Sequence, residues 1–133
     1  MQKNTINNPG HLITNGVVLE RHEYNTINVL LSAGLDVELV VKSRTPHSKS
    51  PDIYMMGMLW EMKAPTGKTL RAIERILHRA IKQSSNIVMD LRRTPMSDEI
   101  LCTAIEKFFH NMRPIRSLWI ITKSKQIVRL KKG

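Results

Sequence analysis

The segment Pro51–Lys63, PDIYMMGMLWEMK, decides the fold. Within it, two short apolar runs, Ile53–Met56 and Met58–Met62, lie on either side of Gly57. Apolar runs joined by a residue that tolerates a tight turn indicate a strand, a turn and a second strand. We therefore predict a β-hairpin in this segment.

The chain before the hairpin contains a helix and a strand. Apolar residues at helical spacing predict a helix over 19–33, with Gly34 as its C-cap. The β-branched run Val37–Val41 predicts a strand. Residues 1–16 are polar, rich in Asn and interrupted by turn-forming pairs, so we predict a flexible leader there.

After the hairpin, the spacing of apolar residues alternates between helical and strand periods. A helix is predicted over 69–83, and its basic residues, Arg79 among them, lie largely opposite its apolar face. The further predicted elements are a strand over 87–89, a helix from the N-cap Ser97 to about 112, and strands over 118–121 and 127–130. This order predicts a single α/β domain over 17–133, with a central mixed sheet flanked by helices.

Composition favours a polyanionic partner. Lys and Arg number 21 against 11 Asp and Glu, which gives a net charge of +10, and such an excess attracts phosphates at long range. A hydrophobic share of 41% over 133 residues is enough for one core and argues against global disorder. The single cysteine, Cys102, leaves no intramolecular disulfide and no zinc cage built from cysteines. Without an apolar run of membrane-spanning length or a signal peptide, we expect no membrane partner and a cytoplasmic location.

Two carboxylates and a lysine come together on the predicted hairpin. Glu61 and Lys63 lie two apart on one strand, so their side chains share a face, and pairing through Gly57 puts Asp52 beside Glu61 or one step diagonal to it. Carboxylates this close repel each other unless a cation lies between them, and an all-oxygen site suits Mg²⁺ or Mn²⁺. Such an ion activates water and phosphate, and Lys63 can balance the charge on the phosphate. The sequence therefore predicts a metal-dependent endonuclease.

The same residues carry a family resemblance. Residues 50–53 (SPDI) and 59–65 (LWEMKAP) resemble the PD-(D/E)xK nuclease superfamily. More narrowly, they resemble the tRNA-cleaving C-terminal toxin domains of bacterial contact-dependent inhibition proteins and their phage and mobile-element relatives. The resemblance runs from about residue 19 to about 92 and includes His22-Glu23 and the segment 80–91 (AIKQSSNIVMDL). It implies a restriction-endonuclease-like fold and favours RNA, tRNA in particular, over DNA.

The resemblance also implies further site residues and a partner. A carboxylate on the first helix often joins the metal site in that superfamily, which matches Glu23, with Glu20 one turn earlier as the alternative. Gln83 matches a position that supports the lysine or the attacking water. The implied catalytic residues are therefore Glu23, Asp52, Glu61, Lys63 and Gln83, with Asp52, Glu61 and Glu23 as metal ligands. A toxin module would act in the cytoplasm of a target cell and would have an immunity protein as its partner.

Basic residues near these positions are candidates for binding nucleic-acid phosphates. They are Lys42, Arg44, Lys49, Lys68, Arg92 and Arg93. Asp90 is expected to cap the loop that follows it and is not placed in the site. The alternatives to an RNA endonuclease are a DNA endonuclease of the same fold, a non-catalytic basic nucleic-acid-binding protein and a structural component of a phage or mobile element. The sequence leaves the oligomeric state open.

Overall fold

The computed structural model describes residues 8–46 and 48–133. Within these ranges it contains three helices and a seven-stranded sheet, which confirms the predicted single α/β domain with a helix-flanked mixed sheet. The elements are β1 (Leu12–Ile13), α1 (Arg21–Ser32), β2 (Val37–Leu39), β3 (Ile53–Met55), β4 (Met58–Lys63), α2 (Leu70–Ala80), β5 (Asn86–Asp90), α3 (Asp98–Asn111), β6 (Ser117–Ile121) and β7 (Ile127–Lys131). No helix of the described part is long and apolar enough to cross a membrane.

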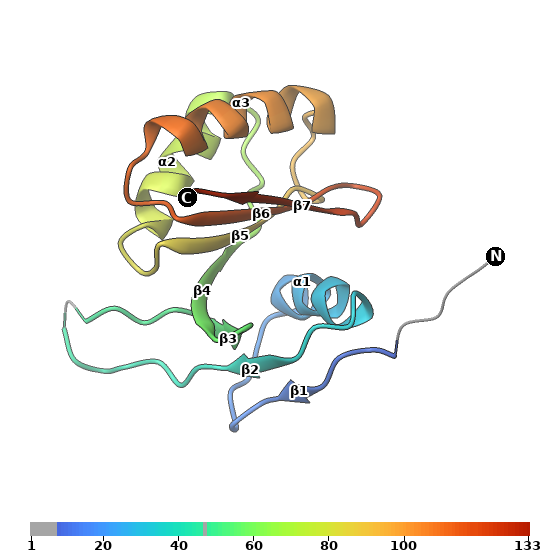
Figure 1. The fold of residues 1–133 in the computed structure, drawn as a ribbon, viewed down its shortest axis with the longest axis vertical. Coiled ribbons are helices and arrows are strands. Elements are labelled where there is room, and N and C mark those ends of the chain that lie inside the picture. The colour runs from blue at the N-terminus through green and yellow to red at the C-terminus, as the bar shows by residue number, and fades with distance from the viewer. Residues whose placement is uncertain (1–7, 47) are drawn as a thin grey trace.

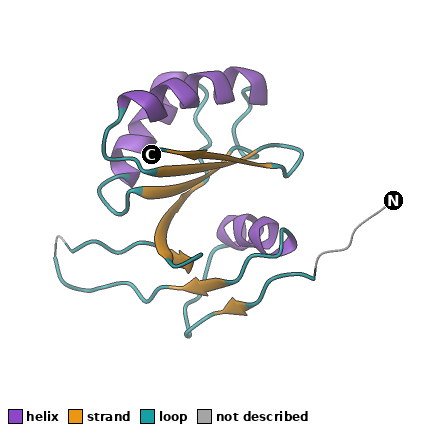
Figure 2. Ribbon diagram, in the orientation of Figure 1, coloured by secondary structure: helices purple, strands orange, loops and turns teal. Residues whose placement is uncertain are grey.

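The strands lie in the sheet in the order in which they occur along the chain, from β1 to β7. The pairs β1–β2, β4–β5 and β5–β6 are parallel, and the other pairs are antiparallel. In Figures 1 and 2, β4 curves from the part of the sheet formed by β1–β3 into the part formed by β5–β7. Its residues 58–60 pair with β3, whereas residues 61–63 pair with β5. The change of partner therefore falls between Trp60 and Glu61.

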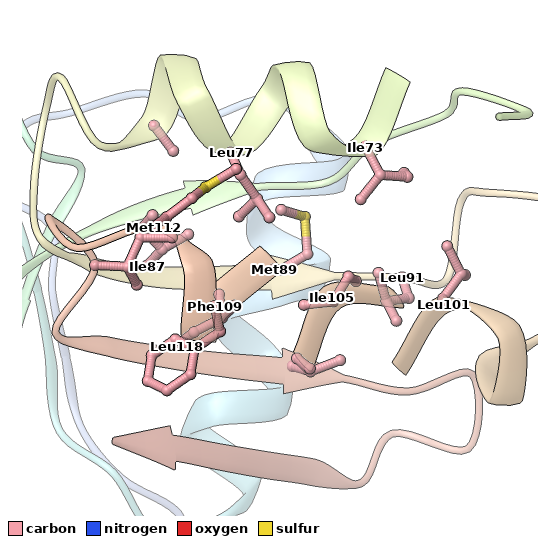
Figure 3. Packing of buried hydrophobic residues seen from close by; sticks show 13 residues of the cluster. Ile73, Leu77, Ile87, Met89, Leu91, Leu101, Ile105, Phe109, Met112 and Leu118 are labelled. Atoms are coloured by element: carbon pink, nitrogen blue, oxygen red, sulfur yellow. The ribbon is translucent and has the colours of Figure 1, made fainter. Parts of the chain in front are cut away.

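Helices cover both faces of the sheet, and a separate apolar core lies under each set. α2 and α3 lie together on one side of the β5–β7 part, and α1 lies on the other (Figure 2). Ile87 and Met89 of β5 face α2 and α3 (Figure 3), while Val88 between them packs in the α1 core. This period-two alternation of apolar residues, with both faces covered, explains the continuous burial of β5 and β6.

Local signals at the ends of several elements are confirmed. The Ser97 hydroxyl accepts a hydrogen bond from the Ile100 amide at 3.4 Å and caps α3 as predicted. Gly34 follows α1 with a φ of +85°, the left-handed conformation of a helix C-terminus. At the hairpin, Met56 and Gly57 both have positive φ, 53° and 75°, as a two-residue turn of the type favoured between antiparallel strands requires.

The predicted leader is shorter than expected. Its residues 1–7 lie outside the described residues, but Leu12–Ile13 form β1 and pair in parallel with β2. The Gly10 amide donates to the Leu31 carbonyl at 2.7 Å, and a Cβ on Gly10 would lie 1.7 Å from the Leu35 carbonyl oxygen. Close backbone contact fixes this segment in place, and such contact leaves no periodic apolar pattern in the sequence.

Candidate functional site

The hairpin places Asp52 directly across from Glu61. Ile53 pairs with Trp60, and the Asp52 amide donates to the Trp60 carbonyl at 2.9 Å, so the register continues by one residue beyond β3. This confirms the predicted pairing of the two carboxylates. The site therefore lies where β4 leaves β3 and joins β5, at an opening between two neighbouring strands.

Both oxygens of the Asp52 carboxylate are engaged. Oδ2 accepts a hydrogen bond from the Met62 amide at 2.8 Å, so the side chain satisfies a β4 donor beyond the end of β3. Oδ1 accepts from Lys42 Nζ at 2.6 Å, and the side chain is 14% exposed. Asp52 is thereby fixed in position.

Glu61 is the carboxylate of the site whose surroundings least favour a negative charge. Its side chain is 7% exposed, and Oε2 lies 3.4 Å from Lys63 Nζ. Oε1 is buried and finds no hydrogen-bond donor among the described residues. Burial raises the pKa of Glu61 to about 7, and the negative charge of Asp52 adds to the rise, although Lys63 and Lys42 oppose it. An ionised carboxylate with one free oxygen in such surroundings favours an added cation.

A cleft of about 370 Å³ joins these residues to two helices. Its lining includes Glu23 from α1, the site residues Asp52, Glu61 and Lys63, and Arg79 from α2. The structure therefore brings together four of the five predicted catalytic residues. Lys63 forms the open side of the group, because its side chain is 32% exposed.

Glu23 lies in the wall of the cleft but is not joined to the carboxylate pair. Its Oε1 accepts a hydrogen bond from the Glu20 amide at 2.9 Å, which caps the first turn of α1. Within residues 8–46 and 48–133, no three His, Cys, Asp or Glu side chains are close enough together to hold one metal ion. The alternative residue, Glu20, points to His22 Nδ1 at 3.6 Å and lines a neighbouring pocket instead.

Gln83 contacts the loop before Asp52. Its Oε1 accepts a hydrogen bond from the Ser50 amide at 2.8 Å, and the residue lines a different pocket, together with Lys49 and Pro51. Because α2 ends at Ala80, Gln83 belongs to the following turn and is directed to the loop before Asp52. Gln83 therefore anchors this loop, and its support of the lysine or of a water molecule stays a prediction.

The predicted phosphate-binding residues fall into free and engaged groups. Arg44, Lys49 and Lys68 are exposed, and Arg93 is exposed with Nη1 3.3 Å from the Ala64 carbonyl at the edge of the cleft. Lys42 is held by Asp52, as described above. Exposed cations are thus available for phosphates, with Arg93 at the edge of the cleft, whereas Lys42 is paired with a carboxylate.

Arg92 is engaged by a buried acid. Its Nε and Nη2 donate to the two Asp90 oxygens at 3.0 and 2.8 Å, and Nη2 also donates to the Asn25 carbonyl at 2.8 Å. Burial raises the pKa of Asp90, but hydrogen bonds from Arg92 and Thr26 outweigh it and hold this pKa below its usual range. The Arg92 amide also donates to Asp90 at 3.1 Å, so Asp90 caps its loop as expected. This pair ties β5 to α1.

Two cleft residues with polar side chains, His22 and Arg79, were not among the predicted site residues. His22 lines both the cleft and the adjoining pocket formed with Arg21, Arg92 and Arg93, and Arg79 lines the cleft from α2. Arg79 follows Ile76, another lining residue, by three positions, so helical periodicity places both on one face. The sequence alone does not show that this side of α2 faces the hairpin, so the spacing could not have identified Arg79.

Comparisons with known proteins place the chain in a family. The model of the family "Contact-dependent growth inhibition CdiA C-terminal domain" matches residues 49–127. Among solved structures, the chain is similar to one described as "CdiA-CT/CdiI toxin and immunity complex from Burkholderia pseudomallei". The TM-score is 0.72 at 20% identity, over 92% of this chain and 100% of that chain, which indicates a shared fold. No curated protein matched.

The family match covers more than half of the chain and includes Asp52, Glu61 and Lys63. It confirms the resemblance to contact-dependent inhibition proteins that these residues carry. The chain therefore belongs to the family of CdiA C-terminal domains of contact-dependent growth inhibition.

Proposed function

We propose that this toxin-family domain is a metal-dependent endonuclease of the PD-(D/E)xK type that hydrolyses phosphodiester bonds in RNA, with tRNA as the favoured substrate. The observation that carries the proposal is the buried Glu61 oxygen without a hydrogen-bond partner, beside Asp52 and Lys63 in one cleft. A carboxylate that folding leaves unsatisfied costs stability, and functional sites are where proteins accept such a cost.

The donor set fits Mg²⁺ or Mn²⁺. Asp52 and Glu61 supply hard carboxylate oxygens, and Mg²⁺ in particular is commonly held by one or two carboxylates together with water and substrate phosphate. A bound ion would supply Lewis-acid activation of the phosphate and acidify a water molecule. Glu23, which lines the same cleft while capping α1, is proposed as the acidic residue of its rim.

The other cleft residues bind and balance the substrate. Lys63, partly exposed beside Glu61, would neutralise the charge that develops on the phosphate during hydrolysis. Arg79 and His22 line the same cleft from two helices and would hold the scissile phosphate in place. Arg93, at the edge near Ala64, would contact a neighbouring phosphate.

The substrate class and the partner rest on the family. The tRNA proposal comes from the resemblance to tRNA-cleaving domains, since a basic cleft by itself binds any nucleic acid. The similar solved structure is described as a toxin and immunity complex. We propose that this chain, too, has an immunity protein, with an acidic surface that covers the basic cleft, and that it acts in the cytoplasm of a target cell.

The test is cleavage of total tRNA and of plasmid DNA by purified protein, with Mg²⁺, with Mn²⁺ and with EDTA. We expect metal-dependent cleavage of tRNA that Asp52→Asn abolishes while RNA binding is retained. Lys107→Met, at an exposed position on α3, is the control and should cleave normally. Cleavage of DNA but not of tRNA would show that the substrate is DNA and would overturn the RNA proposal. Binding without any EDTA-sensitive cleavage would favour a non-catalytic nucleic-acid-binding protein.

A further inference from the structure

Lys42 forms a hydrogen bond with Asp52, a carboxylate that the proposed function assigns to the metal. Its Nζ donates to Asp52 Oδ1 and to the Ser50 carbonyl, both at 2.6 Å. The Lys42 side chain is 50% exposed, whereas that of Asp52 is 14% exposed. The ammonium group therefore covers Asp52 from the solvent side, while the Met62 amide occupies Oδ2.

This contact competes with metal binding. A divalent cation at Asp52 needs an oxygen that faces the cleft, and an ammonium group within hydrogen-bond distance of Oδ1 would repel it strongly. Asp52 and Glu61 are balanced by Lys42 and Lys63 while no metal is bound. Adding a dication gives the cluster an excess of positive charge, which the departure of Lys42 would reduce.

The Lys42 side chain can also detach from Asp52 easily. A lysine is a point charge on a flexible four-carbon stem, and the stem here is half exposed. Arg92 differs, because its guanidinium contacts both oxygens of Asp90. The Arg92 side chain is only 20% exposed and that of Asp90 only 3%. The loop that carries Lys42 stays anchored when the lysine departs, because Gln83 holds the Ser50 amide.

We propose that Lys42 is an exchangeable counter-ion that couples metal loading to nucleic-acid binding. Resting on the proposed function, this inference assigns Lys42 to Asp52 in the free protein and to a backbone phosphate of the substrate in the complex. Transfer of Lys42 to the phosphate exposes Asp52 to the metal. Because such coupling is reciprocal, bound metal also increases the affinity for nucleic acid.

The first experiment measures Mn²⁺ binding to the protein alone by isothermal titration calorimetry at pH 8. Lys42→Met should bind Mn²⁺ about 5- to 50-fold more tightly than the wild type, within the range of coupled sites. Lys42→Gln removes the charge but keeps a donor for Asp52, so it should also bind more tightly. Arg75→Met is the control, because it removes an exposed cation of α2 that does not line the cleft, and its affinity should stay within about twofold of the wild type.

The second experiment measures tRNA binding by fluorescence anisotropy, with and without Mn²⁺. All proteins carry Lys63→Met, so that cleavage is slow during the measurement. Mn²⁺ should tighten binding when Lys42 is present and lose most of this effect in the Lys42→Met double variant. Unchanged or weaker Mn²⁺ binding by folded Lys42→Met, or an equal gain in Mn²⁺ affinity by Arg75→Met, overturns the inference and leaves the nuclease proposal intact. Failure of every variant to bind Mn²⁺ overturns the metal site and the inference together.

Discussion

At the residue scale, Glu61 links stability to pH. Its pKa rises from an ordinary value near 4.5 to about 7 in the folded protein, mainly through burial. The folded state therefore binds a proton more tightly than the unfolded state does, and the stability of the metal-free protein falls as the pH rises from about 4.5 to about 7. The loss is on the order of 3 kcal/mol.

Glu61→Gln should remove this loss. A neutral amide can donate to Asp52 and avoids burying a second charge, so we expect the variant to be more stable than the wild type at pH 8 without metal. The two proteins should be similar at pH 4.5. Urea denaturation at both pH values measures the difference. Mg²⁺ should raise the melting temperature of the wild type at pH 8 and leave that of the variant unchanged. Equal stability of the two proteins at pH 8 would contradict the role of burial.

Lys63 provides a second prediction at this scale. Lys63→Met removes the cation nearest to Glu61 while keeping the length of the stem, so cleavage should slow by roughly 10²- to 10³-fold. RNA affinity should change little, because Lys63 is one cation among many. Single-turnover cleavage and anisotropy separate the two effects, with Lys107→Met as the charge-matched control. A loss of affinity as large as the loss of rate would assign Lys63 to binding alone.

At the element scale, the loop before β3 depends on one side chain. Gln83→Ala removes the acceptor of the Ser50 amide, which should cost about 1 kcal/mol of stability and reduce cleavage by misplacing Asp52. Gln83→Glu keeps an acceptor oxygen and should retain most of the activity. Lys82→Ala, at the exposed neighbouring position, is the control. Wild-type cleavage by Gln83→Ala would show that the loop holds its place without this anchor.

The elements themselves could be predicted where the signal was local. Two apolar runs and the turn at Gly57 predicted the β3–β4 hairpin, and the side chain of Ser97 predicted the start of α3. β1 could not be found, because two residues of strand are too short for a pattern and depend on backbone contacts of Gly10. The direction of Gln83 depends on where α2 ends, which periodicity locates only to within a few residues.

Only the part of the site that depends on local signals could be predicted. Hairpin register brings Asp52 to Glu61, and a spacing of two brings Glu61 to Lys63, so these contacts follow from local geometry. The capture of Arg92 by Asp90 and of Lys42 by Asp52 depends on burial and on the path of a loop. Such contacts decide whether a basic residue is free to bind a phosphate, and sequence spacing does not contain them.

At the scale of the whole molecule, a net charge of +10 makes nucleic-acid binding dependent on salt. The logarithm of the affinity should fall linearly with the logarithm of the salt concentration, with a slope of about −0.7 per contacted phosphate for single strands. Arg93→Met should make this slope shallower by about one phosphate contact. Arg92→Met should instead lower stability, because it leaves Asp90 without its main partner. Anisotropy titrations and thermal melts measure the two effects, and an unchanged slope for Arg93→Met would place Arg93 outside the interface.

The sequential order of the strands has a consequence for how the chain folds. Each strand pairs with the next one along the chain, so no strand waits for a distant segment to arrive. Each pairing closes a segment that contains no more than one helix, so less chain entropy is lost before contacts form than if strands from opposite ends of the chain had to meet. The sheet can therefore grow from one end to the other as the chain emerges.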